Sequence, residues 1–297
     1  MALKLAMHNW MRPEPIDTTI KRLARFGYEA LEISGEPAEY DPAQIKPLLD
    51  QSRIKCWGSV TLMVKGRDLI HEDKYVRVGS IQYVKDCLTL AGKLGGQILT
   101  VIPSTVGKTT PMSSPEKEWK WAVDGLKECQ AHAEKTGVRM AIEPLNRFET
   151  YFINRADQAL ELAHQVGGNC GVCLDFFHMN IEEVSWADAL TSCGDKLLDV
   201  HIADNNRMPP GQGAIDWRQA IKVLTGMGYD GYLTVEFVVP VDRTPRSKRK
   251  EIGDAAEAEG SAGLVQFLRD HGTGAVPERL YDEYVRVSSE YLRGLMK

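Results

Sequence analysis

The sequence predicts an α/β fold, a closed (β/α)8 TIM barrel that forms a single domain over residues 1–297. Eight short apolar segments alternate with longer segments of helical periodicity. The apolar segments are nearly continuous, which is typical of parallel strands covered by helices. Eight such units in fewer than 300 residues favour a closed barrel over an open doubly wound sheet.

The strands are expected where short apolar runs stand between turn residues, at 3–8, 30–34, 55–60, 98–102, 138–142, 171–175, 197–201 and 232–236. An open sheet of this kind would usually carry a glycine-rich nucleotide motif after its first strand. The first strand is followed instead by HNWMRPEP (8–15), which contains no glycine. The barrel is therefore the better prediction.

The helices are indicated by apolar residues at a period near 3.6. Two series show this period, and they run through Val78, Ile81, Val84, Leu88 and Ala91, and through Trp119, Ala122, Leu126, Cys129 and Ala133. Glycines stand where helices should end, at Gly27, Gly95, Gly137, Gly167 and Gly228. The chain is expected to close with an amphipathic helix over 277–296.

One segment, about 238–276, breaks the regular alternation after the eighth strand. It contains RTPRSKRKE (243–251), with five basic residues, followed by an acidic and alanine-rich stretch. A charged run of this kind is often a solvated excursion. Because it directly follows the last strand, a lid over the active site or a subunit contact is the alternative interpretation.

Composition narrows the class of protein. Hydrophobic residues make up 43% and charged residues 26%, as in an ordinary globular protein. We find no signal-peptide pattern and no apolar run near 18 residues, so we expect a cytoplasmic protein without membrane insertion.

The net charge of −5 argues against nucleic acid as a partner. Six cysteines are too few for a disulfide scaffold, and the C-x-x-C of Cys170 and Cys173 has no second pair for zinc.

The last four predicted strands all end in groups that can bind metal or move protons. These residues are Glu143, Asp175, His201 and Glu236. Catalytic groups of parallel barrels converge at this end of the strands. Strand alternation agrees, since Asp175 and Cys173 would face inward while Val172 and Leu174 face the helices.

Three converging carboxylates would repel one another and raise their pKa values, and a divalent cation would resolve this conflict. Oxygen ligands with one imidazole suit a hard or borderline metal, so we expect one divalent ion, Mn²⁺ first, with Mg²⁺ or Co²⁺ as alternatives. Such a metal takes about six ligands, and four from the protein leave about two positions for neighbouring substrate oxygens. Alternatively, each of the four groups caps a helix or pairs with an arginine.

Four motifs carry a family resemblance. They are EPLNRFE (143–149), LDFFHMN (174–180), VHIADNNRMPPGQGAIDW (200–217) and GYLTVE (231–236). In this order they resemble the xylose isomerase-like TIM-barrel group of sugar isomerases and epimerases, and most of all the ketose 3-epimerases of the D-tagatose and D-psicose type. The first half of the chain resembles the group mainly in its alternation of strands and helices and in GYEALEISGE (27–36).

The resemblance implies roles for individual residues. It makes Glu143, Asp175, His201 and Glu236 the metal ligands. It also makes Glu143 and Glu236 the pair that moves protons on opposite faces of the substrate. His178 and Arg207 match residues that contact substrate oxygens next to the metal, and Glu149 matches a glutamate that touches the sugar.

His8 and Trp10 follow the first strand at the same end of the barrel, and we include them as candidate substrate contacts. A packed aromatic residue with a solvent-facing histidine fits this position equally well. Glu32 and Glu36, near the second strand, are similar cases.

The predicted function is a divalent-metal-dependent isomerase or epimerase of a keto sugar, acting through an enediolate by two-glutamate proton transfer. The alternative is a lyase that acts on 3-keto-glycosides, either a C-glycoside deglycosidase subunit or a 3-keto-sugar eliminase or hydratase. It would begin with the same proton abstraction. The atypical stretch 8–15 and the long segment after the last strand favour this alternative. A sugar-acid decarboxylase or dehydratase is a further possibility, and a non-catalytic binding protein should have lost Glu143 or Glu236.

The expected partner is a small sugar or sugar derivative. A related DNA-repair endonuclease needs extra histidines after strands three and four and a D-x-H after strand seven, and the runs GSVTLM, VIPSTVG and GAIDW lack them. We also expect a homo-oligomer, a dimer or tetramer, and a small β-sheet partner subunit if the protein is a C-deglycosidase.

Overall fold

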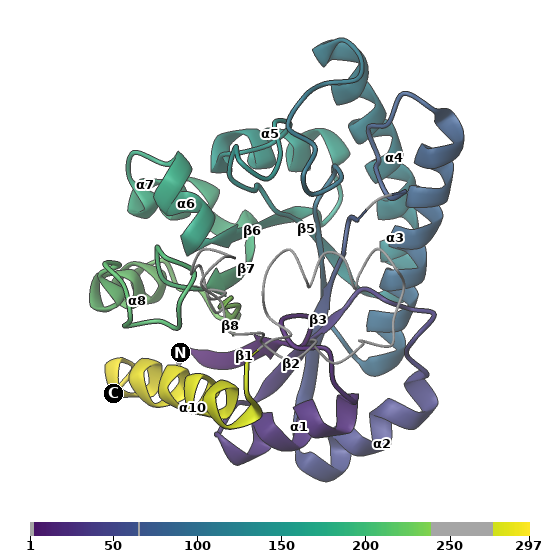
Figure 1. Cartoon of the computed structure of the whole chain (residues 1–297). Coiled ribbons are helices and arrows are strands. Elements are labelled where there is room, and N and C mark those ends of the chain that lie inside the picture. Colours follow the sequence, from purple (N-terminus) through teal and green to yellow (C-terminus); the bar gives the residue numbers. More distant parts are fainter. Residues whose placement is uncertain (1–2, 65, 239–275) are drawn as a thin grey trace, which may run out of the picture.

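The computed structural model describes residues 3–64, 66–238 and 276–297, and it confirms the predicted barrel. Eight parallel strands close in sequence order, with β8 paired to β1 (Figure 1). Their bounds are β1 Lys4–His8, β2 Ala30–Ser34, β3 Lys55–Val60, β4 Ile98–Val101, β5 Arg139–Ile142, β6 Gly171–Asp175, β7 Leu197–Ile202 and β8 Tyr232–Val235. Each lies within one residue of the segment that the sequence predicts.

Helices surround the strands on the outside of the barrel (Figure 1). They are α1 Ile16–Arg25, α2 Pro42–Ser52, α3 Lys74–Leu94, α4 Pro115–Thr136, α5 Ala156–Val166, α6 Phe176–Glu182, α7 Trp186–Cys193, α8 Trp217–Gly226 and α10 Glu278–Leu295. Asp73 and Ser114 accept hydrogen bonds from the first turns of α3 and α4, and Gly95 and Gly137 end these helices with positive φ. Val78, the first residue of one helical series, lies in α3 as expected but is 63% exposed and does not face the core.

The apolar core has two parts, one outside and one inside the barrel. The outer part lies between strands and helices and includes Val172, Leu174 and Leu233. The inner part takes one residue from each strand, namely Ala6, Ala30, Trp57, Ile98, Ala141, Cys173, Leu198 and Tyr232. The predicted inward position of Cys173 is confirmed. These side chains fill the interior of the barrel, where alternate strands contribute to successive layers.

The last helix, α10, packs beside the beginning of the chain and closes the outer ring (Figure 1). The hydroxyl of Tyr28 donates to the carbonyl oxygen of Val285 at 3.0 Å, and Arg22 forms an ion pair with Asp282 at 2.5 Å. The predicted excursion 238–276 lies outside the described residues, apart from its first and last positions. No helix in the described ranges is long and apolar enough to cross a membrane.

We predict opposite effects of alanine at two glycines. The register of β3 against β2 shifts next to Glu32, and a Cβ on the adjacent Gly58 would overlap the carbonyl oxygen of Ile98. Gly58→Ala should therefore lower the free energy of unfolding by about 1–3 kcal/mol. Gly79 lies within α3 with no described atom within 4 Å of a Cβ, so Gly79→Ala should raise it by about 0.5–1 kcal/mol. Urea denaturation of both variants measures these changes, and equal effects would contradict this account of Gly58.

Candidate active site

The four strand-end residues meet at the carboxyl end of the barrel. Glu143 directly follows β5, Asp175 ends β6, His201 lies in β7 and Glu236 directly follows β8. Each of them offers one ligand atom within 4.8 Å of the others, and all four side chains are buried. Asp175 and His201 are direct neighbours in the β6–β7 register, which explains how residues from different parts of the chain come together.

The imidazole of His201 is the centre of this cluster. Its Nδ1 lies 2.8 Å from Glu143 Oε1 and 3.2 Å from Glu236 Oε2. Its Nε2 points the other way, to within 3.2 Å of His8 Nε2 and 3.2 Å of Asp199 Oδ2. One side of the ring therefore contacts the two glutamates, and the opposite nitrogen contacts a second polar group inside the barrel.

Asp175 makes the contacts that the alternative interpretation anticipated, as well as joining the cluster. Its Oδ1 accepts a hydrogen bond from the backbone N–H of Phe177 at 2.7 Å and caps α6. Its Oδ2 forms an ion pair with Arg207, whose other terminal nitrogen lies 3.0 Å from Glu236 Oε2. Capping uses only one carboxylate oxygen, so it does not by itself account for the position of the other.

Burial and neighbouring charges separate the pKa values of the carboxyl groups. Burial raises the pKa of Glu143, although the neighbouring His201 opposes this change. Burial likewise raises the pKa of Asp175, against the charge of Arg207. For Glu236, burial acts in the same direction, but the charges around it, with His201 the largest, hold the pKa well below its usual range. Two carboxyl groups with pKa values pushed apart are typical of acid–base pairs.

The donor set fits a divalent cation. Three buried carboxylates and one imidazole nitrogen converge in a space of ion-ligand dimensions. This is a set that hard and borderline metals prefer, and it leaves positions for a substrate. The structure therefore contains a possible metal site made of the four residues that the sequence singled out.

Sequence reasoning missed the polar layer beneath this site. Asp199 lies two residues before His201 on the same strand, so the period of two could have placed it inside the barrel. The indole of Trp57 donates to Asp199 Oδ1 at 2.9 Å. Glu32, which the sequence suggested only as a case similar to His8 and Trp10, lies 3.5 Å from His201 Nε2. Among the described residues, neither oxygen of Glu32 has a hydrogen-bond partner, and burial raises its pKa to about 8, with Asp199 adding to the rise.

His178 and Glu149 are joined by a residue that the sequence analysis did not consider. Asn146 lies between them, and its Nδ2 is 2.8 Å from Glu149 Oε1 and 2.8 Å from His178 Nδ1. His178 Nε2 lies 3.8 Å from Asp175 Oδ2, at the edge of the possible metal site. The motif EPLNRFE therefore brings a second group to this edge besides Glu143.

Arg207 is held over the cluster by the loop that follows β7. Its backbone has φ of 63°, a left-handed conformation that is uncommon for residues other than glycine. The buried carboxylate of Asp204 organises this loop, since it accepts from the backbone N–H groups of Gly211 and Ile215 and from the indole of Trp217, at 2.9–3.1 Å. The guanidinium lies 4.7 Å from the ring of Phe177.

His8 and Trp10 are both packed against the cluster. His8 is 1% exposed, so the alternative of a solvent-facing histidine is wrong. Its Nε2 is 3.6 Å from Glu236 Oε1, and burial lowers its pKa to about 3, which makes it neutral. The indole of Trp10 donates to Glu236 Oε1 at 2.8 Å. Glu36, the other residue near β2, is buried in an ion pair with Arg67 at 2.8 Å.

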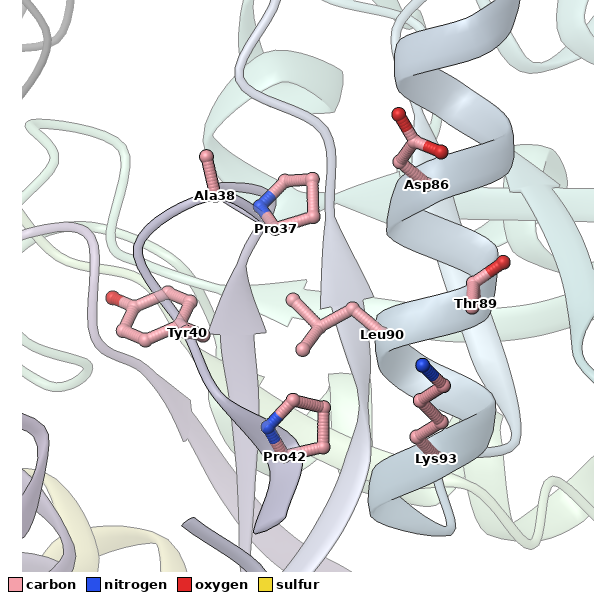
Figure 2. Close-up of a pocket in the computed structure, with 8 residues that line it drawn as sticks. All are labelled: Pro37, Ala38, Tyr40, Pro42, Asp86, Thr89, Leu90 and Lys93. Atoms are coloured by element: carbon pink, nitrogen blue, oxygen red, sulfur yellow. The ribbon is translucent and has the colours of Figure 1, made fainter. Parts of the chain in front are cut away.

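A separate surface pocket of about 340 Å³ lies between the segment after β2 and helix α3 (Figure 2). Its lining residues are Pro37, Ala38, Tyr40, Pro42, Asp86, Thr89, Leu90 and Lys93. None of them belongs to the predicted site. Tyr40 is the one link, because its hydroxyl accepts from Asn9 Nδ2 at 2.7 Å and Asn9 directly follows His8.

A closed (β/α)8 barrel with carboxylates and an imidazole at its mouth is typical of enzymes whose active site lies at the carboxyl ends of the strands. A family model described as "Xylose isomerase-like TIM barrel" matches residues 20–271. The chain belongs to this family, as its motifs indicated.

Among its relatives is a D-psicose 3-epimerase of Ruminiclostridium cellulolyticum, 32% identical over 290 residues, which cover 94% of this chain and 91% of that protein. The 3-dehydro-D-guloside 4-epimerase of Escherichia coli is 30% identical over 237 residues, 75% of this chain and 87% of that protein. A crystal structure of D-psicose 3-epimerase with D-tagatose, from Clostridium cellulolyticum, superposes with a TM-score of 0.82 at 25% identity, covering 99% of this chain and 100% of the other. The predicted class, an isomerase or epimerase of carbohydrates, agrees with these names.

We predict that Asp204 is the main support of the loop that carries Arg207. Asp204→Ala leaves the buried indole N–H of Trp217 and the backbone N–H groups of Gly211 and Ile215 without this acceptor. It should lower the free energy of unfolding by about 2–4 kcal/mol. Asp216 is the control, because it accepts one bond, from Gln219 N, at the exposed start of α8. Asp216→Ala should cost about 1 kcal/mol. Chemical denaturation compares the two, and a smaller loss for Asp204→Ala than for Asp216→Ala would contradict the role given to Asp204.

Proposed function

We propose that this protein is a divalent-metal-dependent epimerase of a keto sugar that works by proton transfer between two glutamates. The observation that carries the proposal is the position of Glu143 and Glu236. Both reach the same nitrogen of His201, yet they come from β5 and β8, on different sides of the barrel mouth. A substrate held above His201 would meet one carboxylate on each face.

In this proposal, Glu143, Asp175, His201 and Glu236 hold the metal. When bound, a divalent cation would supply the positive charge that stabilises the enediolate of the sugar, an effect of several kcal/mol. One glutamate removes the proton from the carbon beside the carbonyl group. The other returns a proton from the opposite face, which inverts that carbon.

Three further residues would bind the sugar. His178 and Arg207 would contact substrate oxygens and steady the developing negative charge. Glu149 would bind a hydroxyl group and, through Asn146, support His178. His8 and Trp10 border Glu236, and we propose that they shape the pocket on that side. Mn²⁺ is the metal we propose first, with Mg²⁺ or Co²⁺ as alternatives, because three carboxylates together with one imidazole suit a hard or borderline metal.

A second candidate concerns the substrate. The relationship to a 3-dehydro-D-guloside 4-epimerase supports a 3-keto-glycoside as an alternative to a free ketose. The predicted lyase on such compounds would start with the same proton removal and then lose a leaving group. The dimer or tetramer and the small β-sheet partner subunit stay predictions.

We predict that free ketohexoses exchange one carbon-bound hydrogen with D₂O when the protein and Mn²⁺ are both present. Loss of the proton signal in NMR measures exchange across a panel of sugars, and EDTA should abolish it, since the proton is too weakly acidic for a carboxylate alone. Exchange with a 3-keto-glucoside and with no free ketose would contradict the ketose proposal. In that case, a product with the inverted carbon indicates an epimerase, and an unsaturated or cleaved product indicates the lyase.

We predict that Glu143→Gln and Glu236→Gln each lower turnover by about 1000-fold or more, because an amide cannot accept and return a proton. Bound Mn²⁺, measured by atomic emission, separates loss of metal from loss of proton transfer. Glu118→Gln is a matched control, because Glu118 is a fully buried glutamate that accepts from backbone N–H groups of Met112 and Ser113, away from the cluster. Full activity in either active-site variant would contradict the two-glutamate mechanism.

A further inference from the structure

The ring nitrogens of His178 lie in different surroundings. Nδ1 faces the backbone N–H of Asn146 at 3.2 Å and the Nδ2 of the same residue at 2.8 Å. Nε2 faces the possible metal site, 3.8 Å from Asp175 Oδ2. A neutral imidazole carries its proton on only one of these nitrogens, and the partners of the other decide which.

The contacts of Asn146 fix the orientation of its amide. Its Oδ1 accepts from the backbone N–H of Phe148 at 3.0 Å, so this atom is the oxygen. Its Nδ2 donates one hydrogen to Glu149 Oε1, and this carboxylate can only accept. The second hydrogen of Nδ2 remains for His178. A flipped amide would place oxygen against the Glu149 carboxylate and nitrogen against a backbone donor.

With the amide oriented in this way, both groups of Asn146 that face His178 Nδ1 are donors. Nδ1 must then accept, and the proton of the neutral ring must lie on Nε2. We infer that Asn146 is a positioning residue that holds His178 as an Nε2–H donor aimed at the edge of the metal site.

This tautomer determines what His178 can bind. A donor at this place selects an acceptor oxygen of the substrate, such as a carbonyl, a hydroxyl or the oxygen of an enediolate. It also stabilises negative charge that develops there. The role of His178 as a donor to the substrate rests on the proposed function, whereas the tautomer itself follows from the contacts of Asn146 alone. Asn146 thus connects Glu149, which we propose binds the sugar, to His178, whose Nε2–H is the donor at the metal site.

The test replaces Asn146 by aspartate, which has acceptors where the amide has a donor. Asn146→Asp should draw the proton to Nδ1, because a carboxylate accepts more strongly than the backbone N–H donates. In Asn146→Ala, the backbone N–H still faces Nδ1, so Nε2–H should remain the main form. Asn169→Asp is the control, since Asn169 Oδ1 already accepts, from Gln130, far from this site.

Long-range ¹H–¹⁵N NMR spectra of histidine-labelled protein measure the tautomer, with His178→Gln to assign the signals. We expect protonated Nε2 in the wild type, Asn146→Ala and Asn169→Asp, and protonated Nδ1 in Asn146→Asp. A protonated Nδ1 in the wild type, or an unchanged tautomer in Asn146→Asp, would overturn the inference.

Steady-state kinetics test the role of His178 as a donor in the reaction. We expect Asn146→Asp to lower kcat by about 100-fold with a smaller change in KM, because a lost oxyanion donor acts mainly in the transition state. Unchanged kcat together with a changed tautomer would overturn the donor role in the reaction. A wild type that shows the expected tautomer but exchanges no sugar proton would contradict the proposed function and leave the role of Asn146 intact.

Discussion

The contact of His201 with two glutamates is the interaction on which the rest of the site depends. Buried carboxylates are unfavourable unless a positive charge or a donor accompanies them. Glu143 and Glu236 both reach Nδ1 of this ring, and Arg207 bridges Asp175 and Glu236 from above. The barrel mouth is thus organised around compensation of negative charge, and the same arrangement can accommodate a divalent cation.

The cluster of charged side chains at the barrel mouth depends on close packing inside the barrel and on well-ordered loops. The packing comes from the inward side chains, one from each strand, that fill the interior of the barrel. The loops are held by polar residues that do not belong to the cluster itself. Asp204 gathers the donors of the segment after β7, and Asn146 joins Glu149 of the segment after β5 to His178 of α6. The loops at the barrel mouth are therefore ordered by residues whose type alone does not indicate such a role.

Much of the site can be predicted because, in a parallel barrel, the carboxyl ends of all strands lie at the same end of the barrel. Once eight apolar strands are recognised, residues at their carboxyl ends must converge, and this rule alone groups Glu143, Asp175, His201 and Glu236. The polar layer beneath was missed for a related reason. Glu32 was named only as a possible pocket residue, and Asp199 was not named at all. Both lie inside strands and not at their ends, although the period of two placed both inward.

The sequence by itself determined the barrel, the order of its strands and the four groups at its mouth, because apolar periodicity and strand ends are local properties of the chain. Only the tertiary structure decided which partners these groups meet. It placed His8 against His201 and away from solvent, and it gave Asp175 both a helix to cap and an arginine to bind. It also placed Asn146 so that one nitrogen of His178 must accept. Such pairings join residues far apart in sequence, and they depend on strand register and on loop conformations that no local pattern encodes.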